Sequence, residues 1–264
     1  MNLRLSLKKI QKDDALALLT EYIPTLSIDY KNHKQVFVES PTDRKYYQML
    51  ADKLIQEKEL ENKLYFVSNS SGKGNCNEVI NIVNQLRKGG NNSCFGIIDW
   101  DKTNDNKDHV LVHGKNYRYS IENFFFDPFY LVSLFLEMGN PHNVRDELGF
   151  AEHYNQYLLG TESVQRLEEI SSWVESKFQD SFQNSDMSER LEVEYLNGKK
   201  VSLPKYFLLE NGHSLEEKYK EVFPALNSFK NNGELVEKLI GIMCRSYPFI
   251  PNESVQVLKQ VSES

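Results

Sequence analysis

Five acidic residues carry most of the chemical information in this chain: Glu39, Asp43, Asp99, Asp101 and Glu122. Glu39 directly follows the apolar run at residues 36–38, and Asp99 and Asp101 follow the run at residues 94–98. Several like charges at one edge of a sheet repel each other, and a bound divalent cation relieves that repulsion. The pattern therefore predicts a metal site at the ends of strands.

The spacing of these acids indicates which of them can share a site. If Glu39 ends a strand and Pro41 begins a helix, Asp43 lies in the first helical turn and faces the same point as Glu39. Asp99 and Asp101 are separated by one residue, so both can project to one side. Hard carboxylate oxygens suit Mg²⁺ or Mn²⁺ better than zinc, and such ions serve phosphodiester chemistry.

Most of the acids also have a structural interpretation. Asp43 alone is typical of a helix cap, and Asp101 alone is typical of a turn. Glu122 is compatible with a cap for the segment 124–126 or an ion pair with Arg118. Glu39 is the hardest to explain in this way, because it comes directly after a buried strand.

The elements that must position these residues follow from the hydrophobic pattern. A helix is predicted over 13–22, followed by a segment in which strands alternate with helices at 41–57 and around 79–86. The predicted strands are 25–30, 35–38, 64–67, 94–98 and 109–113. Most of them are apolar on both faces, which is typical of a parallel sheet covered by helices. Sheets of this α/β class bind ligands at the carboxyl ends of their strands.

The second half of the chain has a different character. Helices are predicted over 129–138, 163–178 and 234–245. The segments 191–195 and 199–203, joined by Asn197-Gly198, predict a β-hairpin with a tight turn. We therefore expect three regions: an N-terminal helix (1–24), a catalytic α/β domain (25–127) and a mostly helical C-terminal region (128–264) for substrate or partner contacts.

Composition limits the class of protein. The chain has 264 residues, a net charge of −7 and three scattered cysteines. Those cysteines favour a reducing compartment over a disulfide framework. With no long apolar run and no apolar signal segment, we expect a cytoplasmic protein without a membrane partner. The acidic balance argues against a general coat on nucleic acid, although a nuclease remains compatible because metal ions offset acidic sites.

Three segments resemble the Toprim domain. Residues 36–43 (VFVESPTD) resemble its first strand and turn, and residues 96–101 (GIIDWD) resemble its Asp-x-Asp motif. Residues 119–124 (YSIENF) resemble an acidic motif of the branch related to the overcoming-lysogenization-defect (OLD) nucleases. Small members of that branch include the Toprim effector of the PARIS anti-phage system, which is paired with an ABC-type ATPase. The resemblance covers residues 35–127 and departs at Ser40, where the family often has glycine.

The resemblance implies a metal-dependent nuclease that uses Mg²⁺ or Mn²⁺. It implies Glu39 as the acid/base or a metal ligand, Asp99 and Asp101 as metal ligands, and Asp43 and Glu122 as further ligands. Such effectors are controlled by an ATPase partner and released on infection to attack RNA or DNA, with transfer RNA a known target. A homodimer and docking on the ATPase both stay open.

Two lysines could assist this chemistry. Lys73 lies in a Gly-Lys-Gly loop after a predicted strand, and Lys115 precedes the Glu122 motif. Either could contact a phosphate, and either is also typical of a solvated loop.

Two other functions compete with a nuclease. The residues Asp99, Asp101 and Thr103 fit the Asp-x-Asp-x-Thr motif of haloacid-dehalogenase phosphatases, but a later apolar strand ending in an acidic pair is missing and Glu39 stays unexplained. The chain could also be a non-catalytic interaction module that regulates an ATPase.

Overall fold

The computed structural model describes residues 33–69, 74–182 and 187–264. The chain divides into two compact units. The first unit contains the described residues up to His113 together with Gln256–Ser264, and the second contains Gly114–Val255. The helix predicted over 13–22 and the strand predicted over 25–30 lie outside the described residues.

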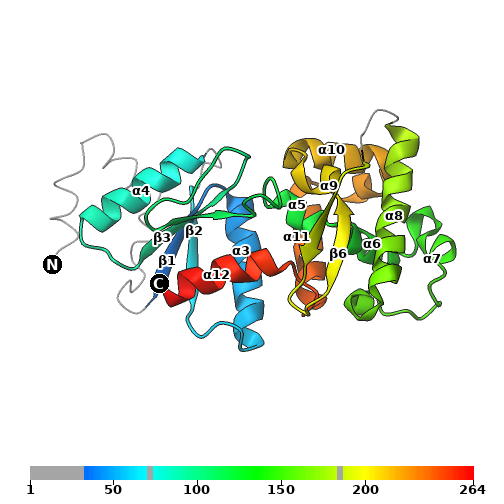
Figure 1. Ribbon diagram of the computed structural model, residues 1–264, viewed down its shortest axis with the longest axis horizontal. Helices are drawn as coiled ribbons and strands as arrows, with labels where there is room; N and C mark the ends of the chain where they lie inside the picture. Colours follow the sequence, from blue (N-terminus) through cyan, green and yellow to red (C-terminus); the bar gives the residue numbers. More distant parts are fainter. Residues whose placement is uncertain (1–32, 70–73, 183–186) are drawn as a thin grey trace. The chain divides into compact units, whose positions relative to one another are not determined.

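A four-stranded parallel sheet forms the centre of the first unit (Figure 1). Its strands are β1 (Lys34–Val38), β2 (Leu64–Ser68), β3 (Cys94–Asp99) and β4 (Val110–His113), in the spatial order β2-β1-β3-β4. All three strand pairs are parallel. The predicted α/β class is thus confirmed.

The strand order reverses beside β1. The chain leaves β1 through α3 (Pro41–Gln56) to reach β2, then crosses back through α4 (Cys76–Lys88) to place β3 on the other side of β1. Right-handed crossovers put these two helices on opposite faces of the sheet, as Figure 1 shows. The reversal lies between the carboxyl ends of β1 and β3, the position at which open α/β sheets bind ligands.

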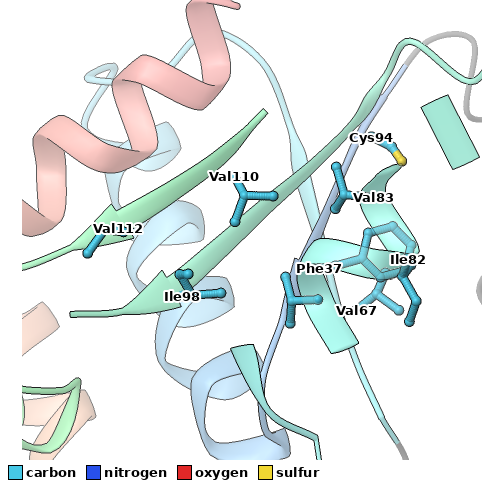
Figure 2. Close-up of a cluster of buried hydrophobic side chains, with 9 residues drawn as sticks. Phe37, Val67, Ile82, Val83, Cys94, Ile98, Val110 and Val112 are labelled. Atoms are coloured by element: carbon cyan, nitrogen blue, oxygen red, sulfur yellow. The ribbon is translucent and has the colours of Figure 1, made fainter. Parts of the chain in front are cut away.

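The α4 face of the sheet holds a hydrophobic cluster. Figure 2 shows that Ile98, Val110 and Val112 point to the same face as Phe37 and Val67. The α4 side chains Val79, Ile82 and Val83 complete this cluster. Because side chains alternate along a strand, the residues after Ile98 and Val112, which are Asp99 and His113, face the α3 side.

The end of the chain belongs to the first unit. Helix α12 spans Asn252–Glu263, and its residues from Gln256 onward are part of this unit. The Lys34 ammonium donates hydrogen bonds to the carbonyls of Val261 and Ser262 at 2.8 and 2.7 Å, and Lys259 pairs with Glu59 at 2.6 Å. A cation at the negative end of a helix is favourable. The sequence pattern did not predict this helix.

The second unit is helical with one hairpin, as predicted. Helix α6 (Pro128–Glu137) is buried along nearly its whole length. The hairpin strands are β5 (Arg190–Glu194) and β6 (Lys200–Pro204), with Glu194 opposite Lys200. The longer helices around them are α8 (Val164–Ser181), α10 (Gly212–Val222) and α11 (Asn232–Arg245). The shorter helices are α5 (Glu122–Phe125), α7 (Val144–Glu147) and α9 (Lys205–Leu209).

The boundary between the units differs from the predicted one at residues 127/128. The chain passes into the second unit after His113, because Phe124, Phe125 and Phe126 are buried there. Phe126 stacks on Tyr219 of α10, with ring centroids 5.5 Å apart. The Glu122 segment is therefore part of the second unit. Within the residues that the structure describes, no helix is long and apolar enough to cross a membrane.

Candidate active site at the carboxyl edge of the sheet

Glu39 and Asp99 meet at the reversal point of the sheet. Glu39 directly follows β1 and Asp99 is the last residue of β3. An Oε1 atom of Glu39 accepts a hydrogen bond from the backbone N–H of Asp99 at 3.0 Å. Both residues are half-buried, so their side chains keep access to solvent. The structure thus brings together two of the predicted site residues.

Asp43 has a structural task at the same edge. Ser40 is the N-cap of α3, and its side chain accepts a hydrogen bond from the Asp43 N–H at 3.1 Å. In return, Asp43 accepts from the Ser40 N–H at 3.0 Å and from the Ser40 hydroxyl at 2.7 Å. This reciprocal capping box satisfies backbone donors at the start of the helix. It also accounts for the serine at this position, because Ser40 has an extended backbone that needs no glycine.

The Asp-x-Asp segment turns sharply after β3. Asp101 and Lys102 both have left-handed backbone conformations, with φ of 48° and 60°. The Asn104 side-chain amide donates to the Asp99 carbonyl at 2.8 Å, which closes the turn. Consecutive non-glycine residues in this region are strained, and such strain is concentrated at functional sites. The segment is a turn rather than a continued strand.

The four predicted site acids of the first unit act electrostatically on two neutral side chains, Tyr47 and Cys76. Burial raises the pKa of Tyr47 well above its usual range, and the charges of Asp99, Asp43 and Glu39 raise it further. Burial also raises the pKa of the Cys76 thiol, and Glu39 and Asp101 add to that shift. The negative charges of these acids therefore act on both side chains at this edge.

Gly74 packs directly on Glu39. A Cβ atom built on Gly74 would lie 2.1 Å from the Glu39 carbonyl oxygen. Close to this contact, Glu78 accepts a hydrogen bond from the Asn69 side chain at 3.3 Å, and its backbone N–H donates to the Asn75 side chain at 3.1 Å. Only glycine allows so close a backbone approach. The Gly-Lys-Gly sequence contains this glycine, but no local pattern reveals its approach to Glu39.

Tyr47 and His113 lie beneath the acids and were not predicted as site residues. The Tyr47 hydroxyl and His113 Nδ1 form a hydrogen bond of 2.8 Å, and each residue is only 1% exposed. His113 is also the Cα partner of Asp99 in the parallel pairing of β3 and β4. Its position at a strand end was the signal in the sequence that could have identified it.

Glu122 has partners of its own in the second unit. Its Oε2 atom accepts a hydrogen bond from the Ser120 hydroxyl at 2.6 Å. A Cβ atom on Gly212 would lie 2.6 Å from the same oxygen, so this carboxylate packs against the first residue of α10. A negative charge at the start of a helix is stabilising. Glu122 thus holds a defined structural position, and its predicted role as a metal ligand stays a prediction.

The structure describes one of the two predicted lysines. Lys73 lies outside the described residues. Lys115 is exposed in the second unit, in a turn where the N–H groups of Tyr117 and Arg118 both donate to the Gly114 carbonyl at 2.8 Å.

The donor set can be compared with what a metal ion needs. Across residues 33–69, 74–182 and 187–264, no group of three or more histidine, cysteine, aspartate or glutamate side chains is arranged to hold a metal ion. Magnesium in phosphate-processing sites is commonly held by one or two carboxylates, with waters and substrate phosphates completing the shell. The neighbouring Glu39 and Asp99, both half-buried oxygen donors, fit this open type of site.

Comparison with known proteins gave no match to a family model, to a curated protein or to a solved structure.

Proposed function

We propose that this chain is a metal-dependent phosphodiesterase that cleaves nucleic acid at the carboxyl edge of β1 and β3. The observation that carries the proposal is the hydrogen bond between the Glu39 carboxylate and the Asp99 N–H, which brings two acidic strand-end residues together at the reversal point of a parallel sheet. The resemblance of residues 36–43, 96–101 and 119–124 to Toprim motifs supports the same chemistry.

In this proposal the residues have distinct roles. Glu39 is a ligand or the general acid/base, and the Asp99 N–H fixes the orientation of its carboxylate. Asp99 is the second ligand, and Asp101 and Asp43 supply further negative charge. An Mg²⁺ or Mn²⁺ ion, when bound, would neutralise phosphate charge and lower the pKa of a bound water.

The test uses purified protein with labelled pools of RNA and DNA. Cleavage is measured with Mg²⁺, with Mn²⁺ and with EDTA. We expect cleavage of at least one pool with either ion and none with EDTA. Cleavage that persists in EDTA would contradict the metal-dependent mechanism, and the preferred pool would identify the substrate class.

The wider role is a separate part of the proposal. By the same resemblance, the chain would be the toxic effector of an anti-phage system under the control of an ATPase subunit. Co-expression with an ATPase encoded beside it, followed by affinity purification and a toxicity assay, tests this part. A chain that neither co-purifies with nor is silenced by such a subunit would contradict it.

The phosphatase alternative has less support in the fold. In the described sheet, the strand after β3 is β4, and it ends in His113-Gly114 rather than in an acidic pair. The phosphatase nucleophile motif at Asp99 and Asp101 would also follow β3, the third strand of the described sheet along the chain. Glu39 would then have no role in the reaction.

A further inference from the structure

The buried pair Tyr47 and His113 is unusual for a hydrophobic layer. Both side chains are almost completely inaccessible, yet each carries polar atoms. Tyr47 stacks on Phe66 with ring centroids 5.6 Å apart, and Tyr46 meets Tyr47 edge-on at 5.1 Å. Burying polar groups is costly unless they are hydrogen-bonded, and retaining a histidine here calls for a reason beyond packing.

The sheet places this pair next to Asp99. His113 and Asp99 are Cα partners on neighbouring parallel strands, so their side chains emerge on the same face of the sheet. Tyr47 projects from α3, which covers that face, and its hydroxyl reaches His113 Nδ1. Tyr47 and His113 therefore lie on the face of the sheet from which the Asp99 side chain emerges.

The hydrogen bond restrains the imidazole ring. The Tyr47 hydroxyl and His113 Nδ1 lie 2.8 Å apart, and the tautomer of the ring decides which of them donates. The phenol of Tyr47 keeps its proton, because burial and the neighbouring carboxylates disfavour its ionised form. The bond restricts the orientation of the ring, as is typical of groups that orient metal-ligating side chains.

We infer that Tyr47 and His113 are positioning residues for Asp99, holding its carboxylate in the orientation that the proposed metal-dependent reaction requires. This inference rests on the proposed function. Neither residue touches the reacting atoms, and both act through Asp99. The expected signature is a change in ion affinity rather than a loss of the chemical step.

The experiment compares two variants with a matched control. Tyr47→Phe removes one oxygen and leaves the ring in place, and His113→Asn removes the imidazole. Tyr130→Phe is the control, because Tyr130 is also 1% exposed and its hydroxyl also makes a hydrogen bond of 2.8 Å, to the Phe249 carbonyl in the second unit. Mn²⁺ binding is measured by electron paramagnetic resonance, together with the Mg²⁺ concentration for half-maximal cleavage and the Tm of each protein.

We expect both Tyr47→Phe and His113→Asn to raise the Kd for Mn²⁺ about 10-fold, with a parallel rise in the Mg²⁺ requirement. Tyr130→Phe should lower the Tm without changing the Kd. A Tyr47→Phe protein that folds and binds Mn²⁺ like the wild type would overturn the inference, even if His113→Asn fails to fold.

The two hypotheses fail in different ways. A wild-type protein that binds Mn²⁺ but cleaves neither RNA nor DNA would contradict the proposed nuclease. In that case, a raised Kd for Mn²⁺ in Tyr47→Phe would still support the role of Tyr47 and His113 as positioning residues. A wild-type protein that binds no Mn²⁺ would overturn both.

Discussion

The Glu39 carboxylate and the Asp99 backbone N–H form a 3.0 Å hydrogen bond between residues that are sixty positions apart in the sequence. The bond joins the ends of β1 and β3, where the strand order reverses. It orients the carboxylate that follows the first strand and ties it to the start of the Asp-x-Asp turn. This relationship is the basis for the first prediction.

Glu39→Gln should abolish metal-dependent cleavage while leaving the fold intact. The amide oxygen of glutamine can still accept from the Asp99 N–H, but the negative charge is lost. Because an ion site supplies several kcal/mol to a transition state, we expect a rate loss of about 100-fold or more. Cleavage of labelled RNA and DNA at matched Mg²⁺, with a circular-dichroism melt as the control, checks this. Wild-type cleavage by the variant would favour the non-catalytic module.

Gly74→Ala should disturb the site through its backbone. The new Cβ would lie 2.1 Å from the Glu39 carbonyl oxygen, so the strand end or the loop must move. We expect a loss of about 1–3 kcal/mol in stability and a marked loss of cleavage. The control is Gly233→Ala in α11, where the nearest atom is the Asn231 side chain at 3.2 Å. Equal behaviour of the two variants would contradict this role for Gly74.

Glu122→Gln separates a structural role from a ligand role. If the carboxylate mainly stabilises the start of α10, the variant loses about 0.3–1 kcal/mol and keeps the wild-type Mg²⁺ requirement. Thermal melts and an Mg²⁺ titration of cleavage are measured together, with the exposed Glu217 of the same helix as the control site. A raised Mg²⁺ requirement with an unchanged Tm would instead show the ligand role that the family resemblance implies.

Asp127→Asn should be among the most destabilising single changes in the second unit. Arg118 and Asp127 form a fully buried ion pair at 2.8 Å, and the Tyr195 hydroxyl donates to the same carboxylate oxygen at 2.7 Å. Removing the acid leaves a buried guanidinium uncompensated, which costs about 3–5 kcal/mol. An asparagine oxygen can keep the cap on the Phe129 N–H, but the amide NH2 then faces the Arg118 and Tyr195 donors, so the variant removes a charge and an acceptor together.

The control for that variant is Glu169→Gln, which breaks the exposed pair with Arg166. It should cost at most about 0.5 kcal/mol by chemical denaturation. Similar losses of unfolding free energy for Asp127→Asn and Glu169→Gln would show that the buried ion pair contributes no more to stability than the exposed one.

Glu137 should make the second unit sensitive to acid. Burial alone would raise the pKa of Glu137, but hydrogen bonds from Lys238 and Tyr157 outweigh it, and the charges of Lys238 and Arg245 lower the pKa further below its ordinary 4.5. A depressed carboxyl pKa stabilises the fold above the unfolded value, and this contribution is lost as the pH falls through the folded value.

The measurement for Glu137 is a set of thermal melts of the wild type and Glu137→Gln. The Tm difference between them should be full at about pH 7 and should shrink below about pH 4.5, as protonation removes the same charge. A difference that stays constant across this range would contradict the assignment.

The hydrophobic pattern alone predicted most of the parallel sheet. Short runs such as 64–67 and 94–98 are apolar at every position, which is sufficient to indicate strands buried on both faces. The hairpin at Asn197-Gly198 was also predictable from a local signal, because the residues of the turn fix the register of its two strands. Helix α12 was not predicted, and its place in the first unit depends on distant contacts, because the carbonyls of Val261 and Ser262 accept from Lys34, 227 and 228 positions away.

The carboxylates at strand ends were also visible in the sequence, because strand order in such folds places these ends at one edge. The capping box of Asp43 with Ser40 is local, and the sequence already indicated it. Only the tertiary structure decided that Glu39 bonds to Asp99 and that Glu122 packs in a different unit from both. The pairing of Tyr47 with His113 depends on the register of β4 and the face covered by α3. Such contacts join residues tens of positions apart, and no local pattern encodes them.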